Sequence, residues 1–572
     1  MFASFCAVAL LVSHAYAFVD VSVIPMDRER VVEHQTVVVN DGRIAQIGAV
    51  TDVAVPRGAT RIDGRGKFLM PGLVDTHVHL RTRNELPLYV ANGVTTVFNL
   101  DGRPLHLLFR TRTASGELLG PAIYTVGPKF DKARTAEESV AEVEAQHAAG
   151  YDGIKIYAGV SKAEYPALLA AARRHRMFIV GHVPREVGFE GTLAAGQALE
   201  HAEEIVYTYF NKTLDIDKLV FDESRIPEVV KLMKESGIWF TPTLVTYDQI
   251  MQQAADLDAF LERPELRFVS PALRDRLSPA NNQYKRGFKP DQVPKVRQNL
   301  AFQKKVVAAL HAAGVPMMAG TDAMGIGATG GFSLHEELRN FVECGFSPYE
   351  ALRTATSNPA RFLETNDFGT VTAGARADLL LLDANPLADV ANANRRAGVM
   401  ARGRWYPERE LRRVVEGLPR AYAEEERFLL RSLHGDVAKA LKYLDENDSG
   451  RTGSHVLAKI AATEGTETLA KIVQRAQQFD PRSTLVAERT INDLGYQLLR
   501  TKNLAGAIEV FRLNVTLYPQ AANTYDSLAE AYDANGDTAG AVANYRKALE
   551  VNPRYANAEF AAEYVARGGR RP

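Results

Sequence analysis

Apolar, β-branched runs alternate with helical patterns through the middle of the chain, between about residues 68 and 365. Eight strand–helix alternations of this kind are typical of an α/β fold, the (β/α)8 TIM barrel. A long polar segment between the last two predicted strands, residues 244–299, is expected to form a helical lid. The predicted strands are Leu69–His77, Val94–Phe98, Ala122–Val126, Gly153–Tyr157, Phe178–His182, Ala198–His201, Ile238–Pro242 and Pro316–Thr321.

Short strand patterns flank this predicted barrel (68–365) on both sides. Before it, two β-rich runs and an Asp41-Gly42 turn predict a hairpin. After it, strand character returns in residues 369–371, 377–383 and 399–406. We therefore expect one small β-sandwich domain built from residues 18–67 and 366–407. The runs before the barrel are Phe18–Ile24, Thr36–Val39 and Arg43–Ile47.

The C-terminal part is predicted to be all-α, with a charged helical linker over residues 408–486 followed by an internal repeat over 487–565. Leu494, Leu498, Ala507, Phe511 and Pro519 recur as Leu528, Tyr532, Ala541, Tyr545 and Pro553, each 34 residues later. That period resembles tetratricopeptide (TPR) repeats. Two coincidentally similar helical hairpins are the alternative. Such repeats present a concave surface suited to protein partners. Because the barrel is complete without them, truncation after about residue 410 is expected to leave kcat within a few-fold if the fragment folds.

The first 17 residues contain no Asp, Glu, Lys or Arg and end in Ala15-Tyr16-Ala17. This pattern predicts a signal peptide over residues 1–17, cleaved after Ala17, and a secreted or periplasmic protein. A buried N-terminal strand or a misplaced start codon are the alternatives, and either would leave a cytoplasmic protein. No run of 18 apolar residues predicts a membrane-spanning helix.

Charge and cysteine content exclude some partners and some kinds of metal site. Lys plus Arg number 68 and Asp plus Glu 69, so no global basic field exists to bind nucleic acid. Cys6 and Cys344 are the two cysteines, too few for a disulfide framework or a cysteine zinc site. Any metal must therefore be held by His, Asp, Glu or Lys.

Polar residues with such side chains lie where the predicted strands end. His77 and His79 alternate on one strand and so point to one face, while Lys155 faces the barrel core. A bare ammonium there is costly, which favours either a structural Lys–Asp pair or a lysine carboxylated by carbon dioxide. Active sites of these barrels form at the strand C-termini, and imidazole and carboxylate ligands suit zinc. The predicted metal site contains His77, His79, Lys155, His182, His201 and Asp322.

Five motifs carry a family resemblance. They are PGLVDTHVH at 71–79, GVTTV at 93–97, GTD at 320–322, LRTATSNPA at 352–360 and GARADL at 374–379. With them, residues 20–405 resemble the binuclear amidohydrolase superfamily, in particular its imidazolonepropionase-like and Xaa-Pro dipeptidase-like branch. The repeats lie outside this resemblance.

The resemblance implies a mechanism. His77, His79 and Asp322 would hold one divalent metal, and His182 and His201 a second, both expected to be Zn. Carboxylated Lys155 and a hydroxide would bridge the two ions, and Asp322 would carry the proton from the hydroxide to the leaving nitrogen. The implied reaction is hydrolysis of an amide-type C–N bond in a peptide-like or N-acyl amino acid substrate.

Substrate contacts are expected from loops at the strand ends. Arginine clamps a carboxylate and tyrosine donates to an oxyanion, although each such residue could instead be a solvated loop residue. Two other functions remain open, a mononuclear deaminase or cyclic-amide hydrolase of the same fold, and a non-enzymatic repeat-bearing scaffold. The substrate-binding candidates are Arg103, Tyr157, Arg185 and Tyr247. Packing or surface roles are expected for His106, His147, His175, His311 and His335.

Overall fold

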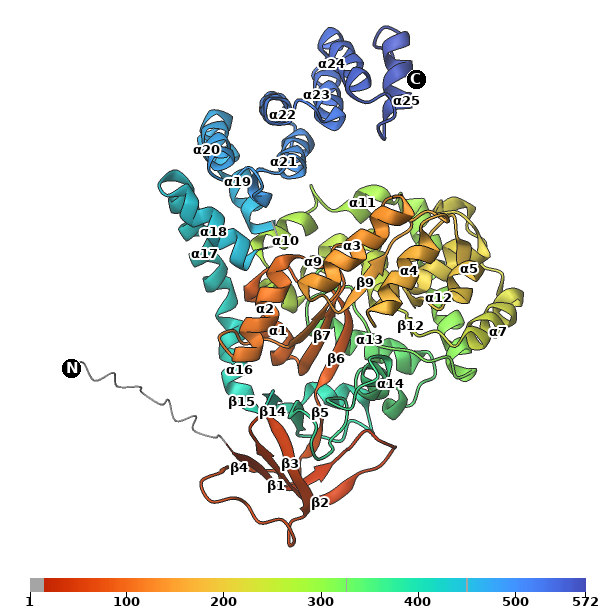
Figure 1. Ribbon diagram of the computed structural model, residues 1–572, viewed down its shortest axis with the longest axis vertical. Coiled ribbons are helices and arrows are strands. Elements are labelled where there is room, and N and C mark those ends of the chain that lie inside the picture. The colour runs from red at the N-terminus through yellow and green to blue at the C-terminus, as the bar shows by residue number, and fades with distance from the viewer. Residues whose placement is uncertain (1–14, 326, 449–450, 572) are drawn as a thin grey trace, which may run out of the picture. The chain divides into compact units, whose positions relative to one another are not determined.

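The structure is a computed structural model that describes residues 15–325, 327–448 and 451–571 (Figure 1). The chain divides into two compact units. The first contains residues up to Leu80, Leu86–Ala255 and Pro290–Glu416. The second, which we call the helical unit, contains Arg81–Glu85, Asp256–Lys289 and the chain from Gly417 on. The helical unit therefore includes two segments that the sequence assigned to the barrel.

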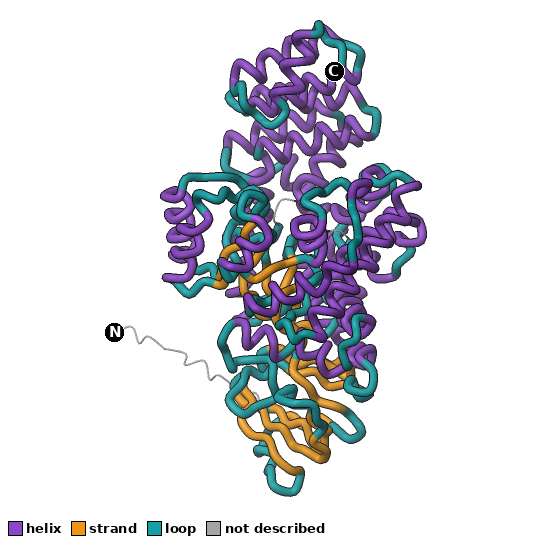
Figure 2. Tube along the Cα trace, turned by 90° about the vertical axis from the view of Figure 1, so that its right-hand side faces the viewer, coloured by secondary structure: helices purple, strands orange, loops and turns teal. Residues whose placement is uncertain are grey.

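The strands before and after the central region form one eight-stranded hydrogen-bonded sheet, with strand order β15-β14-β13-β5-β1-β2-β3 and β4 beside β1. Strand β5 pairs antiparallel with β13, and this pairing joins the strands before the central region to those after it (Figure 2). No strand forms at residues 369–371, which lie in an irregular, bent segment. The strands are β1 (Tyr16–Val23), β2 (Val32–Asn40), β3 (Arg43–Ala49), β4 (Thr60–Asp63), β5 (Phe68–Pro71), β13 (Leu379–Leu382), β14 (Arg396–Ala401) and β15 (Arg404–Pro407).

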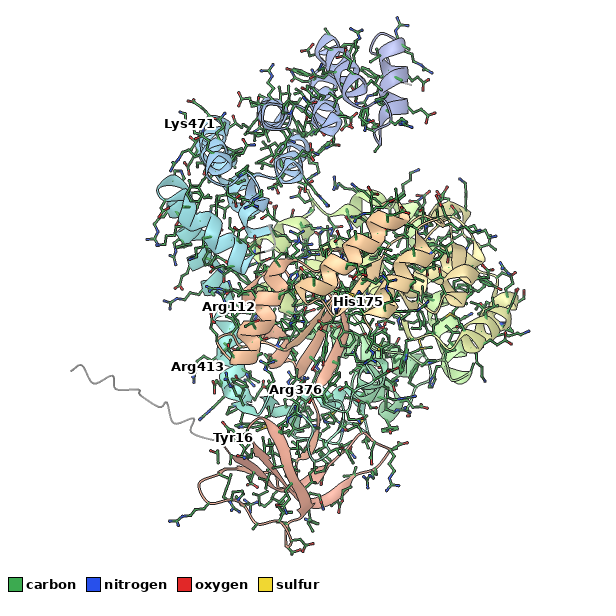
Figure 3. All side chains as sticks on the ribbon, viewed as in Figure 1. Tyr16, Arg112, His175, Arg376, Arg413 and Lys471 are labelled. Carbon is green, nitrogen blue, oxygen red and sulfur yellow. The ribbon has the colours of Figure 1, made fainter. Side chains whose placement is uncertain are left out.

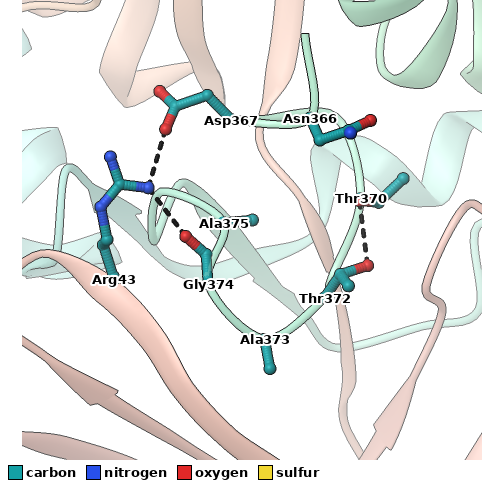
Figure 4. A pocket seen from close by; sticks show the side chains of 8 residues that line it. All are labelled: Arg43, Asn366, Asp367, Thr370, Thr372, Ala373, Gly374 and Ala375. Atoms are coloured by element: carbon teal, nitrogen blue, oxygen red, sulfur yellow. Dashed lines mark hydrogen bonds and ion pairs between the residues drawn. The ribbon is translucent and has the colours of Figure 1, made fainter.

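Two arginines form hydrogen bonds with the turn after residue 365 and connect it to the sheet. Arg43 Nη1 donates to Asp367 Oδ1 at 2.8 Å and to the Gly374 carbonyl at 2.7 Å (Figure 4). Arg376, labelled in Figure 3, donates to Asp367 and also to Thr96 Oγ1 at 2.7 Å. Thr96 lies on a parallel strand, so Arg376 connects the large sheet to the strands that carry the candidate site.

Parallel strands form two further sheets, β6-β7-β8 and β9-β10-β11-β12. Bridges from Val126 to Gly153 and from Phe130 to Ile156 join these sheets. Residues 316–323 bridge to β12 on one side and β6 on the other. The strands are β6 (Leu73–Val78), β7 (Val94–Asn99), β8 (Ala122–Thr125), β9 (Gly153–Ile156), β10 (Phe178–Gly181), β11 (Ala198–Glu200) and β12 (Phe240–Thr241).

The predicted strand Leu69–His77 is two strands, because the chain passes from the large sheet to the parallel strands at Gly72. A Cβ added to Gly72 would lie 2.1 Å from Thr95 Oγ1, so only glycine allows this approach.

Helices follow the parallel strands in the order that the sequence predicted. Their ends carry standard signals: Thr135 caps α3 by accepting from the Glu138 amide, and Gly150 ends it at φ +91°. The helices of the first unit are α1 (Leu86–Ala91), α2 (Pro104–Ser115), α3 (Ala136–Ala149), α4 (Tyr165–Arg174), α5 (Gly188–Ala194), α6 (Ala202–Ile205), α7 (Ile226–Ser236), α8 (Leu244–Ala255), α12 (Val293–Ala312), α13 (Phe332–Glu343), α14 (Pro348–Thr354), α15 (Ser357–Phe362) and α16 (Glu408–Glu416).

The helical unit combines C-terminal helices with the inserted residues 256–289. Helices α21 and α23 begin 34 residues apart, as do α22 and α24, in agreement with the predicted period. Leu494 and Leu528 are buried in the same core cluster. The helices are α9 (Leu257–Leu261), α10 (Pro271–Leu277), α11 (Gln283–Gly287), α17 (Leu418–His434), α18 (Val437–Asn447), α19 (Arg451–Glu464), α20 (Thr466–Phe479), α21 (Glu488–Arg500), α22 (Leu504–Leu517), α23 (Ala522–Ala534), α24 (Thr538–Val551) and α25 (Ala558–Ala566).

Most of the predicted signal peptide, residues 1–14, lies outside the described residues. Strand β1 begins at Tyr16, and Ala17 is buried and paired with Val38. Cleavage after Ala17 would therefore remove the first two residues of β1, and export stays a prediction. Among the helices of the described chain, none has the length and apolar character needed to cross a bilayer.

Candidate metal centre

Three predicted ligands meet at the ends of the parallel strands. Asp322 Oδ1 lies 2.7 Å from His79 Nε2 and 3.5 Å from His77 Nε2. One ligand atom from each of the three residues lies within 4.8 Å of the others, and all three residues are buried. This confirms the expected His–His–Asp group that could hold a metal ion.

The other predicted ligands adjoin this group. The His201 ring centroid lies 4.6 Å from the centroids of both His77 and His182. Lys155 is fully buried on β9, and within the described residues its Nζ has no hydrogen-bond partner. This observation gives no support to the alternative of a structural Lys–Asp pair, and an unpaired ammonium is expensive in such a place.

Backbone geometry fixes two of these side chains. His201 has φ +71° and Asp322 has φ +54°, in the left-handed region that costs non-glycine residues about 1–3 kcal/mol. Buried Asp75 stabilises the turn at Asp322, because its carboxylate accepts from the Thr321 amide at 3.1 Å and from Thr321 Oγ1 at 2.6 Å. It also accepts from the His77 amide, and so links both strand ends.

Each of three imidazoles has a partner at Nδ1, which leaves Nε2 to face the centre. The distances are 2.5 Å from His77 to Glu200 Oε2, 3.1 Å from His182 to Glu204 Oε1, and 2.8 Å from His201 to Thr243 Oγ1. Partners of this kind orient metal-ligating histidines. Sequence analysis missed all three partners. Of the three, only Glu200 could have been suspected from the sequence, because it directly precedes the predicted ligand His201.

The electrostatics of the cluster suit metal binding. Burial, with the neighbouring Lys155 charge, holds the pKa of His77 well below its usual range, and burial does the same for His201. Burial would raise the pKa of Asp322, but the charge and hydrogen bond of His79, together with the charges of His201 and Lys155, lower that pKa below its usual range. Burial also lowers the pKa of Lys155. Neutral imidazoles and an ionised carboxylate are the forms that bind metals.

The four substrate-binding candidates differ in position. The Tyr157 ring centroid lies 4.4 Å from that of His182, and Arg185 Nη1 lies 3.3 Å from the Glu204 carboxylate that holds His182. Tyr247 is only 3% exposed on α8, and its hydroxyl accepts from Asn299 Nδ2 at 2.7 Å. Arg103 precedes α2, and its amide donates to His106. Tyr157 and Arg185 are thus beside the centre.

The five histidines for which packing or surface roles were expected have packing contacts. His106 and His335 are buried, with Nε2 close to the Leu80 and Asn92 carbonyls. His311 stacks on Phe346. His147 stacks on His175 with ring centroids 4.0 Å apart.

The sequence model of the amidohydrolase family matches residues 68–406, more than half of the chain. The chain belongs to the amidohydrolase family. This match confirms the resemblance at the level of the family and the predicted hydrolase class.

Individual amidohydrolases and related structures resemble parts of the chain. A dihydroorotase of Mycobacterium tuberculosis is 53% identical over 49 residues, which is 9% of this chain and 11% of that protein's length. A putative prolidase from Bifidobacterium longum has a TM-score of 0.53 at 24% identity, over 71% of this chain and 99% of that one. A bottromycin amidohydrolase has a TM-score of 0.58 at 21% identity, over 72% and 90%. At these identities the two structures show a shared fold.

Proposed function

We propose that this protein is a metal-dependent amidohydrolase that cleaves an amide-type C–N bond in a peptide-like or N-acyl amino acid substrate. The observation that carries the proposal is the buried His77–His79–Asp322 group beside His201, His182 and Lys155. The ring of parallel pairings from β6 to residues 316–323 supports a closed (β/α)8 barrel, in which these strand ends form the active-site face.

The residues present fit two divalent ions, with zinc as the proposed metal. His77, His79 and Asp322 would hold one ion, His182 and His201 the other, and carboxylated Lys155 would bridge them. The fit rests on Lys155 Nζ, a buried amine without a hydrogen-bond partner in the described chain, for which a carbamate supplies two anionic oxygens. When bound, such ions supply Lewis acidity toward a carbonyl oxygen and lower the pKa of a bound water.

The chain's own groups then have distinct tasks. Asp322 would accept a proton and deliver it to the leaving nitrogen, because its carboxylate is ionised at the centre of the group. Glu200, Glu204 and Thr243 hold the imidazole rings in place. Tyr157 and Arg185 are the proposed substrate contacts beside the centre. Arg103 and Tyr247 remain the second-choice candidates.

Three further proposals concern the rest of the chain. The imidazolonepropionase-like and Xaa-Pro dipeptidase-like branch is the proposed place in the family. The 34-residue spacing of helix starts supports TPR-like repeats that bind a protein partner. Export as a secreted or periplasmic protein rests on the uncharged N-terminus.

The test is a hydrolysis screen with the full chain loaded with zinc. Substrates are N-acyl amino acids, Xaa-Pro dipeptides and Xaa-Arg dipeptides, with Asp322→Asn and metal-stripped protein as controls. We expect amine release by the wild type only. Ammonia release from aminopurines without amide cleavage would instead favour the mononuclear deaminase, and inactivity of the fully loaded enzyme on both sets would contradict the proposal.

A further inference from the structure

The start of helix α8 contacts the surroundings of two proposed metal ligands, and all of these residues lie in the first unit. Thr243, the residue before α8, has its Oγ1 2.8 Å from His201 Nδ1. Thr246, in the first turn, donates from Oγ1 to the Thr321 carbonyl at 3.0 Å, and Thr321 directly precedes Asp322. His201 and Asp322 are assigned to different ions, so the start of α8 adjoins both halves of the centre.

Thr243 needs support to keep its hydroxyl in this place. Its φ of +48° lies in the left-handed region, which is unfavourable for a β-branched residue. The residue is fully buried, and its carbonyl accepts from the Thr246 amide at 3.0 Å, which closes the turn into α8. A strained backbone of this kind persists only where the surrounding structure over-determines it. The contacts of the first turn of α8 therefore decide where the Thr243 hydroxyl lies.

Glu337, on α13, supplies such support. Its Oε1 accepts from the Leu244 amide at 3.0 Å, and its Oε2 accepts from the Val245 amide at 2.7 Å. These are the first two amides of α8, which have no acceptor within their own helix, and a carboxylate at a helix N-terminus also complements the helix dipole. Glu337 is fully buried. Losing it would leave two amides without their acceptor away from water, which costs more than losing a surface bond.

We propose that Glu337 is a positioning residue for the metal centre. By holding the first turn of α8, it fixes the Thr243 hydroxyl beside His201 Nδ1. The same turn carries the Thr246 hydroxyl that bonds to the strand end before Asp322. The inference rests on the proposed function for the nature of the centre. Because the two threonines adjoin ligands of different ions, weakening this one contact should affect the binding of both ions.

The experiment compares Glu337→Gln with the control Glu343→Gln in the full chain loaded with Co²⁺, a divalent ion whose visible absorption reports the geometry of its ligands. Glu343 is on the same helix, but its side chain is 61% exposed. Glutamine keeps one acceptor oxygen and turns an NH₂ group toward the second amide, so it removes one of the two bonds at nearly constant volume. By chelator competition, we expect Glu337→Gln to bind Co²⁺ about tenfold more weakly, with an altered spectrum, and Glu343→Gln to match the wild type.

A double-mutant cycle separates positioning from a general loss of stability. Thr243→Val removes the hydroxyl and keeps the side-chain shape. If Glu337 acts through that hydroxyl, the tenfold effect of Glu337→Gln should shrink to about threefold in the Thr243→Val background. Fully additive effects would overturn the inference, as would a wild-type affinity and spectrum in Glu337→Gln. Amide hydrogen exchange of residues 243–250 should also rise about tenfold in Glu337→Gln, with peptides from β1 to β3 unchanged.

Two further outcomes keep this inference separate from the proposed function. Should Glu337→Gln not fold, Glu337→Asp keeps both oxygens on a side chain one methylene shorter and should shift affinity, spectrum and exchange in the same directions. A wild type that binds Co²⁺ but cleaves no amide would end the proposed function, and the affinity, spectrum and cycle would still decide the inference. A wild type that binds no Co²⁺ would overturn both.

Discussion

The Glu200 carboxylate lies 2.5 Å from Nδ1 of His77, and both side chains are buried. This pair turns His77 Nε2 toward Asp322. Replacing Glu200 with Ala should therefore lower metal affinity about 10- to 100-fold while every ligand remains. Chelator competition measures the affinity, with exposed Glu235→Ala as the control. Unchanged affinity would mean that strand pairing alone orients His77.

Lys155 provides the sharpest test of two metals. Lys155→Ala removes the proposed bridge, so the variant should bind fewer metal ions and lose most activity. Small carboxylic acids should restore part of that activity, because they supply two oxygens. Intact wild-type protein at neutral pH should carry the added mass of carbon dioxide, and acid should release it. If Lys155→Ala keeps its full metal content and near-normal turnover, the proposed bridging role of Lys155 is wrong, and a wild type that binds one ion would favour the single-metal alternative.

The stability of the helical unit should fall as pH rises. Burial raises the pKa of both Glu85 and Glu425 from 4.5 to about 7, so the folded state holds more protons than the unfolded state between these values. Their stabilising contribution is full below pH 4.5 and is lost as pH rises through about 7. For Glu425 the change is on the order of 3 kcal/mol.

Urea unfolding between pH 4.5 and 8 measures this effect, with far-UV circular dichroism as the probe. Glu425→Gln should flatten the pH dependence, because glutamine does not titrate, and Glu424→Gln should leave it as in the wild type. Equal slopes in all three proteins would contradict the assignment to Glu425.

Truncation after residue 410 should disrupt the protein, contrary to the expectation from sequence. Residues 256–289 bury Leu266, Phe268 and Leu273 within the helical unit, and Gln497 of α21 donates to Asp275 there. Without the C-terminal helices these apolar side chains lose their cover. The lost burial of these side chains costs on the order of a few kcal/mol of folding free energy. We therefore expect the truncated chain to aggregate or to lose over 90% of its soluble yield, which gel filtration measures. A soluble fragment with near-normal kcat would restore the original expectation.

Sequence patterns predicted the candidate ligands because each lies at a strand end, which is a local signal. His79 and Asp322 meet because their strands are neighbours, and the alternation of elements already indicates that. The partners Glu204 and Thr243 could not be predicted in the same way, since their roles depend on how loops from different strands meet. The break at Gly72 was also hidden, because it depends on Thr95 across the sheet. The interleaved composition of the helical unit had no local signature at all.

That interleaving has a consequence for synthesis of the chain. Asn84 leaves the ribosome 341 residues before its partner Glu425, and Asp275 precedes Gln497 by 222. The inserted segments therefore lack their partner residues until the last third of the polypeptide has been made. Contacts so distant in sequence form slowly and leave intermediates open to aggregation. Maturation of the nascent enzyme thus ends with its C-terminal helices, long after the residues of the metal centre have been translated.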